Sequence, residues 1–146
     1  MLNILVLCTG NSCRSQIAHG YLRHFTDAEK VTVYSAGIET HGVNPRAVAT
    51  MRADGIDIAQ HTSNNVDEYA DIEFDVVITV CDNANERCPV FTRKNQHERS
   101  ELLKLHYNFP DPAKSVGTET EINAAFEAVR AQIKAYCAGL AGGMNL

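Results

Sequence analysis

Apolar residues form an almost unbroken run over residues 2–7, at the start of the chain. Such a run is typical of a strand that is buried on both faces, like the central strands of parallel sheets. The run stops at Cys8, and residues 9–13 contain nothing bulky and apolar. From Arg14 to Phe25 apolar residues recur at intervals of three and four, which predicts an amphipathic helix. The chain therefore opens as a strand, a tight polar loop and a helix.

Three later runs that are short and apolar predict further strands, over residues 31–37, 75–80 and 102–107. Strands that alternate with helices form parallel sheets with right-handed crossovers. We therefore predict an α/β fold for residues 1–146: a single three-layer domain with a four-stranded parallel sheet and helices on both faces. In such sheets the site lies beyond the carboxyl ends of the strands, where Cys8, Cys81 and Asp111 are all expected.

Capping signals place the remaining helices. Asn44 before Pro45 predicts a helix over about residues 45–53, and a capping box from Thr118 to Glu121 opens the last helix. A short helix is expected to end at Tyr69, and residues 141–146 are expected to fray. Residues 82–101 are polar without clear periodicity, which favours a functional or mobile segment.

The loop after the first strand has the composition of an anion site. Backbone N–H groups converge there, the helix dipole adds partial positive charge, and Arg14 supplies a planar fork for an oxyanion. Cys8 lies where these charges meet, and the Ser15 hydroxyl is expected to donate to its sulfur. These effects predict a lowered pKa and an activated nucleophile at Cys8. The alternative is that Cys8 is a small core residue at the end of a strand.

The Cys-x5-Arg-Ser spacing resembles the loop of low-molecular-weight protein tyrosine phosphatases and of the arsenate reductases that share their fold. The variant in this chain is most similar to the thioredoxin-linked arsenate reductases, and the resemblance extends to Asp111-Pro112 near the end of the chain. It implies that the loop residues bind the oxyanion, that Cys8 attacks arsenic, and that Asp111 protonates a leaving oxygen. The Asp-Pro pair could instead be only a turn. The implied oxyanion-binding residues are Thr9, Gly10, Asn11, Ser12, Cys13, Arg14 and Ser15.

Two further cysteines separate a reductase from a phosphatase. Reduction needs a dithiol, and Cys81 follows a buried strand while Cys88 lies seven residues on, too far to meet it unless that segment refolds. The resemblance implies that Cys81 attacks the Cys8 sulfur and that Cys88 then attacks Cys81, which leaves a Cys81–Cys88 disulfide for thioredoxin. The alternative is that both cysteines are incidental. Cys13 could form a protective disulfide with Cys8, although we favour a residue that simply fills the loop.

Composition narrows the partners. The net charge is −5 without any basic run, so nucleic acid is not expected, and no apolar run is long enough to cross a membrane. Five cysteines without a basic signal segment favour catalysis in the cytoplasm. Their spacing does not match zinc ligands. We expect arsenate and thioredoxin as partners, a monomer, and no cofactor or metal.

The resemblance also bears on potassium, which some arsenate reductases of this family bind near the loop. The matching positions here are Asn11, His19, Ser35 and Asn64, so the carboxylates that a hard cation favours are missing.

Two other functions remain open from the sequence: a low-molecular-weight phosphatase, and a non-catalytic redox sensor that uses Cys81 and Cys88. Against the phosphatase, Ala113 and Lys114 follow Asp111-Pro112 where aromatic residues would grip a phosphotyrosine ring.

Overall fold

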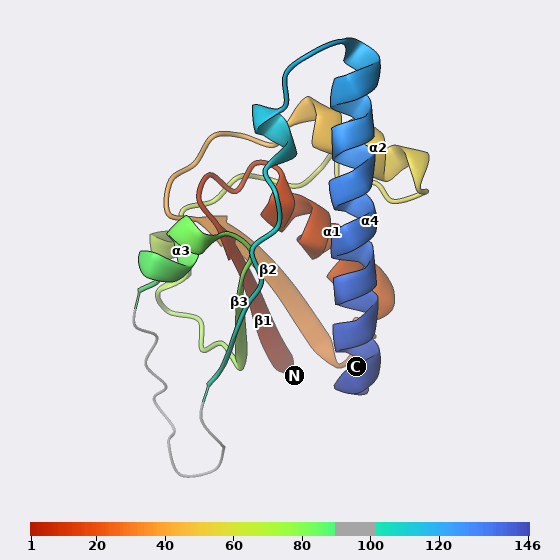
Figure 1. The fold of residues 1–146 in the computed structure, drawn as a ribbon. Helices are drawn as coiled ribbons and strands as arrows, with labels where there is room; N and C mark the ends of the chain where they lie inside the picture. Colours follow the sequence, from red (N-terminus) through yellow and green to blue (C-terminus); the bar gives the residue numbers. More distant parts are fainter. Residues whose placement is uncertain (90–101) are drawn as a thin grey trace.

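Four parallel strands form one sheet in a computed structural model that describes residues 1–89 and 102–146 (Figure 1). The sheet order is β2-β1-β3-β4, and every neighbouring pair runs parallel. The carboxyl ends of the strands therefore lie at one edge, which confirms the predicted sheet. The strands are β1 (Leu2–Cys8), β2 (Val31–Gly37), β3 (Val76–Thr79) and β4 (Leu103–His106).

Helices cover both faces of the sheet, as predicted. On one face lie α1 (Arg14–Phe25), α2 (Pro45–Ala53) and the long α4 (Glu119–Gly143), which Figure 1 shows side by side. The shorter elements are the 3-10 helix η1 (Val66–Tyr69), whose Tyr69 packs against Tyr34 of β2, and α3 (Asp82–Glu86), which contacts β1 and β3. A second 3-10 helix, η2 (Pro112–Lys114), lies between β4 and α4.

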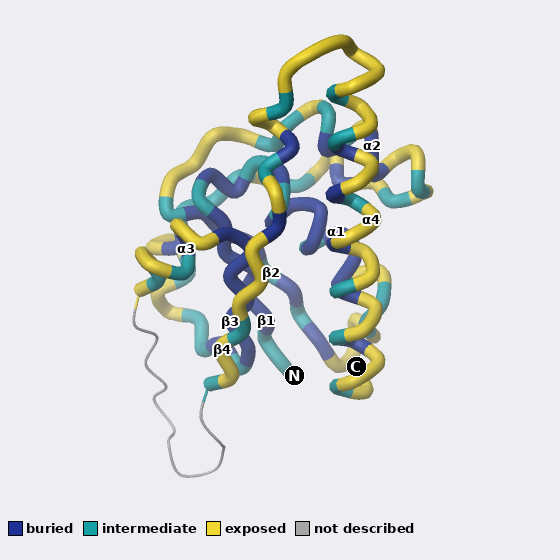
Figure 2. The backbone as a smooth tube through the Cα atoms, in the orientation of Figure 1, coloured by how far each residue is buried: buried dark blue, intermediate teal, exposed yellow. Residues whose placement is uncertain are grey.

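The core lies between β1, β3 and the inner faces of α1 and α4, where Figure 2 shows continuous burial. Ile4, Leu5, Val6 and Leu7 are completely buried because β1 is covered on both faces. The edge strand β4 is mostly exposed. This pattern explains why β1 reads as an unbroken apolar run.

Three local predictions are corrected. Residues 82–86 form α3, which the sequence analysis treated as irregular; its N-cap is the Cys81 sulfur, which accepts from the Ala84 N–H at 3.4 Å. Helix α4 continues to Gly143 instead of fraying from residue 141, because Ala141 is buried against the core. The fourth strand is shorter than predicted. The rest of the segment expected to be functional or mobile, residues 90–101, lies outside the described residues.

Candidate active site

The loop between β1 and α1, residues 8–14, is named here the oxyanion loop. Every carbonyl from residue 8 to residue 12 accepts a hydrogen bond from a group outside the loop. The donors, in loop order, are the Ile38 N–H, the Glu39 N–H, the His41 N–H together with the Ser63 hydroxyl, the Gln16 side chain, and the Asn44 N–H. Because the carbonyls are held outward, the loop N–H groups are left to face the cavity, which makes an anion site.

Asn11 fixes the shape of this loop. It has a φ of 47°, in the left-handed region that asparagine tolerates better than most residues. Its side chain is completely buried; Nδ2 donates to Ser15 Oγ at 2.9 Å and Oδ1 accepts from the Asn64 N–H at 2.8 Å. Ser15 is therefore placed as a buried support of the loop, and its hydrogen bond to the Cys8 sulfur stays a prediction.

Helix α1 begins directly after the loop at Arg14, with Cys13 as its N-cap. Among the described residues no side chain caps its first turn, so the N–H groups there stay available to a ligand. The Arg14 guanidinium is held by the Phe109 carbonyl at 3.0 Å and lies 3.6 Å from Asp111 (Nη2 to Oδ2). Asp111 in turn accepts from the Ala113 N–H at 3.0 Å through its other oxygen. These contacts bring the predicted acid and the predicted oxyanion fork together.

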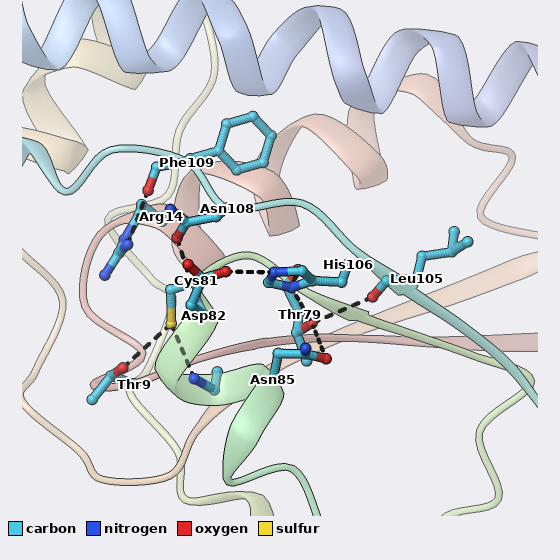
Figure 3. Close-up of polar contacts among 11 residues, drawn as sticks. Thr9, Arg14, Thr79, Cys81, Asp82, Asn85, Leu105, His106, Asn108 and Phe109 are labelled. Atoms are coloured by element: carbon cyan, nitrogen blue, oxygen red, sulfur yellow. Dashed lines mark hydrogen bonds and ion pairs between the residues drawn. The ribbon is translucent and has the colours of Figure 1, made fainter.

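Cys8 and Cys81 meet at the carboxyl edge of the sheet. Cys8 is the last residue of β1, and Cys81 lies two residues past the end of the neighbouring strand β3; both are buried, and their thiols affect each other's pKa. Figure 3 shows Cys81 with Thr9, whose Oγ1 lies 3.3 Å from the sulfur. Asn83 donates to that same oxygen at 3.0 Å, and the Thr9 hydroxyl is the donor to Cys81 whenever that sulfur is a thiolate. All five cysteines are free thiols.

The pKa values of Cys8 and Cys81 differ from those that the sequence predicted. The hydrogen bond from Cys8, then the Thr9 hydroxyl, the Ala84 N–H and Arg14, lower the pKa of Cys81 to about 5. The pKa of Cys8 is raised, because the hydrogen bond to Cys81 and burial favour its thiol over the pull of Arg14 and the Thr9 N–H. The surroundings therefore favour a thiolate at Cys81, whereas the sequence predicted a lowered pKa at Cys8; the two sulfurs titrate as a pair.

The other cysteines lie where the sequence placed them. Cys13 is buried in the loop, and burial raises its pKa to about 12, which suits a filler of the loop better than an attacking thiol. Cys137 is buried in the core on α4. Cys88 is half-buried beyond the far end of α3. Along seven residues, mostly helical, a rise of 1.5 Å per residue separates its Cα from that of Cys81 by about 10 Å.

A cavity of about 520 Å³ opens over the oxyanion loop. It is lined by Cys8, Arg14, Cys81 and Asp111, and also by residues that the sequence analysis did not assign: His41, Asp82, Asn83 and Asn108. Ala113 and Lys114 line it as well, so the wall that follows Asp111-Pro112 carries a methyl group and a cation. Of these residues, His41 comes from the loop after β2, Asp82 and Asn83 open α3 directly after Cys81, and the register of β3 with β4 brings Asn108 beside the oxyanion loop.

The four positions that match a potassium site do come together. His19 Nδ1 lies 2.8 Å from Ser35 Oγ, and Asn11 contacts Asn64. Burial, then His61 and Arg23, lower the pKa of His19 to about 3, so its ring is neutral. Within residues 1–89 and 102–146, no group of three or more acidic, histidine or cysteine side chains could hold a metal ion. Nor does any helix there have the length and apolar character needed to cross a bilayer.

The fold, the Cys-x5-Arg loop and the opposed Asp111 define one class of protein. The model of the low molecular weight phosphotyrosine protein phosphatase family matches residues 3–145, and the chain belongs to this family. Its curated relatives include arsenate reductases from Halalkalibacterium halodurans, 45% identical over 130 residues, and Bacillus licheniformis, 47% identical over 131; each match covers 89% of this chain and 88% of the relative. A solved arsenate reductase in its phosphate-binding state superposes with a TM-score of 0.73, at 30% identity and 98% coverage of both chains.

Proposed function

We propose that this protein reduces arsenate to arsenite with electrons from thioredoxin. The observation that carries the proposal is the arrangement of three thiols: Cys8 and Cys81 are buried at the same cavity beside an anion-binding loop, and Cys88 lies beyond α3. A phosphatase needs only the first of these cysteines. The curated relatives named arsenate reductase support the same activity.

In the first step a proton moves from Cys8 to Cys81, which leaves a Cys8 thiolate facing Arg14 and the loop N–H groups. This thiolate attacks arsenic, and Asp111 delivers a proton to the oxygen that leaves as water. Thr9, Gly10, Asn11, Ser12, Cys13 and Ser15 form and support the cradle for the remaining oxygens. The product is a Cys8–arsenate thioester in which arsenic is still pentavalent.

In the second step Cys81 first releases the proton that it took from Cys8 to water in the cavity, and the resulting thiolate attacks the Cys8 sulfur. The Cys8–Cys81 bond forms, the sulfur–arsenic bond breaks, and its electron pair stays on arsenic, which leaves as arsenite. Cys88 then attacks Cys81, Cys8 departs as a thiolate, and the Cys81–Cys88 disulfide passes its oxidation to the dithiol of thioredoxin. No metal or organic cofactor takes part in this scheme, and it suits a monomer in the reducing cytoplasm.

The cavity wall favours a small oxyanion over an aryl ester. Ala113 and Lys114 offer no ring to stack on a phosphotyrosine, whereas the lysine adds positive charge for a dianion. Phosphate and arsenate have nearly the same shape, so weak phosphatase activity is expected beside the reductase activity. The low-molecular-weight phosphatase remains the alternative function, since the family contains both.

Replacing each cysteine should stop the reaction at a different stage. Cys8→Ser should be inactive on arsenate and on an aryl phosphate. Cys81→Ser should still hydrolyse the aryl phosphate but not turn over arsenate. Cys88→Ser should release about one arsenite per enzyme and stall with Cys8 joined to Cys81. The measurements are NADPH consumption with thioredoxin and its reductase, and peptide mapping of the disulfides. Wild-type arsenate turnover in both Cys81→Ser and Cys88→Ser would favour the phosphatase.

A further inference from the structure

Two polar side-chain contacts hold α3 at its two ends. At the first residue of the helix, Asp82 Oδ1 lies 2.7 Å from His106 Nε2 on β4 (Figure 3). At the C-cap, Arg87 Nη1 lies 3.5 Å from Glu39 Oε1. These residues flank the two cysteines directly, Asp82 after Cys81 and Arg87 before Cys88.

The two partners of α3, His106 and Glu39, are themselves held in place by other contacts. His106 Nδ1 lies 2.7 Å from Thr79 Oγ1 at the end of β3, so the imidazole bridges the sheet and the helix. Glu39 is bound through its backbone N–H to the Thr9 carbonyl of the oxyanion loop at 2.8 Å. Its carboxylate also contacts His41 Nε2 at 2.9 Å, and the His41 ring covers Gly10 so closely that any side chain there would collide with it. The two ends of α3 are thus tied to the sheet edge and to the loop.

A Cys81–Cys88 disulfide conflicts with this arrangement. Its Cα atoms must lie about 4.4–6.8 Å apart, whereas the folded segment holds them about 10 Å apart by the helical rise. The segment between the cysteines must therefore lose its helical form. Residues 82 and 87 are adjacent to the joined cysteines and cannot keep both fixed partners while the ends approach each other.

We propose that Asp82–His106 and Arg87–Glu39 are positioning contacts that stabilise the reduced form of the Cys81–Cys88 pair and oppose the opening of α3. The inference rests on the proposed function, because it assumes that this disulfide is the one handed to thioredoxin. Contacts present only in the reduced state make the disulfide a stronger oxidant and so favour its reduction by an external dithiol. They also keep Cys88 away from Cys81 until Cys8 has reacted.

The test is the equilibrium of this disulfide with glutathione, measured on the whole protein by alkylating thiols and counting them by mass spectrometry. His106→Leu and Arg87→Met each remove one contact, and neither residue lines the cavity. Exposed contacts of this kind contribute modestly, so each variant should form the disulfide about threefold more readily. The double variant should reach about tenfold, which corresponds to about 30 mV for a two-electron couple.

Conservative variants separate these contacts from general effects on folding. His106→Gln keeps a donor for Asp82 and Arg87→Lys keeps the charge, so both should stay near the wild-type equilibrium. Hydrolysis of an aryl phosphate, which needs only the oxyanion loop and Asp111, should be unchanged in all five variants. Wild-type equilibria in His106→Leu, Arg87→Met and the double variant would overturn the inference. If the wild-type protein itself forms no Cys81–Cys88 disulfide in oxidised glutathione, the proposed relay fails instead.

Discussion

At the scale of single residues, Thr9 helps to lower the pKa of Cys81, after the larger effect of Cys8. Its oxygen accepts from Asn83 and lies 3.3 Å from the Cys81 sulfur, to which its hydroxyl donates when that sulfur is a thiolate. A hydrogen bond to a charged group contributes about 1.5–3 kcal/mol, and one pKa unit is about 1.4 kcal/mol. Removing the hydroxyl should therefore raise the pKa of the first thiol to ionise by at least about one unit.

Thr9→Val tests this with almost no change of volume. Above a pH of about 5 the wild-type pair carries a thiolate, so alkylation should stay fast down to that pH and fall below it. In Thr9→Val the midpoint should move upward, since the lost donor favours the protonated form, while Thr9→Ser should keep the wild-type midpoint. The measurement is the rate of iodoacetamide modification from pH 4 to 9, with and without phosphate in the cavity. An unchanged midpoint in Thr9→Val would remove Thr9 from this role.

The residues of the site were predictable where they are neighbours in sequence. Cys8, Arg14 and Ser15 have fixed spacing on a strand, a loop and a helix, so their meeting follows from the apolar pattern alone. The pKa shifts of Cys8 and Cys81 were not predictable, because they depend on the contact between the two residues. The pairing of β1 with β3 brings them together. His106 and Asn108 were missed for the same reason: a strand register sets them, and the sequence carries no local signal of it.

At the scale of elements, the shape of the oxyanion loop depends on the buried side chain and the left-handed backbone of Asn11. Asn11→Ala should lower the free energy of unfolding by about 2–3 kcal/mol, from two lost hydrogen bonds of about 1 kcal/mol each and about 1 kcal/mol of left-handed strain. Asn11→Gly loses the same hydrogen bonds without that strain, so it should be the more stable of the two. Urea unfolding gives the energies, and protection of Cys8 from alkylation by phosphate reports the loop.

Both variants should bind phosphate more weakly, because the Asn64 N–H and Ser15 lose their partner. If Asn11→Ala keeps the stability and phosphate affinity of the wild-type protein, the loop is held by other contacts.

Among the elements, β1, α1, α2 and the start of α4 were predicted close to their true bounds, since caps and apolar periodicity mark them. Helix α3 was missed because its five residues bury only Ala84 and its cap is a cysteine sulfur, which no capping rule signals.

At the scale of the whole molecule, an acidic protein presents one anion site because the local field of the oxyanion loop outweighs a net charge of −5. Exposed charges more than about 8 Å away are largely screened at physiological salt. Parallel strands bring Cys8, Cys81 and Arg14 to the same edge of the sheet, so a single fold supplies the anion cradle and the first two thiols. What the fold holds apart is Cys88, and α3 is the element that must change for it to take part.

We expect no response of this protein to potassium, because His19 and Asn64 occupy positions where carboxylates would be needed to bind the cation. His19 is neutral and contacts Ser35, and the Asn64 side-chain oxygen already accepts from the Thr62 hydroxyl at 2.7 Å. A hard cation favours several oxygens and carboxylate charge, and this position offers an imidazole and an occupied amide. We expect the melting temperature and the arsenate turnover to be the same in potassium and sodium at equal ionic strength. Because binding to the native state raises the melting temperature, an increase in potassium alone, together with a several-fold gain in turnover, would contradict this. His19→Glu restores one carboxylate beside Ser35 and is the matched variant in which a response to potassium should appear.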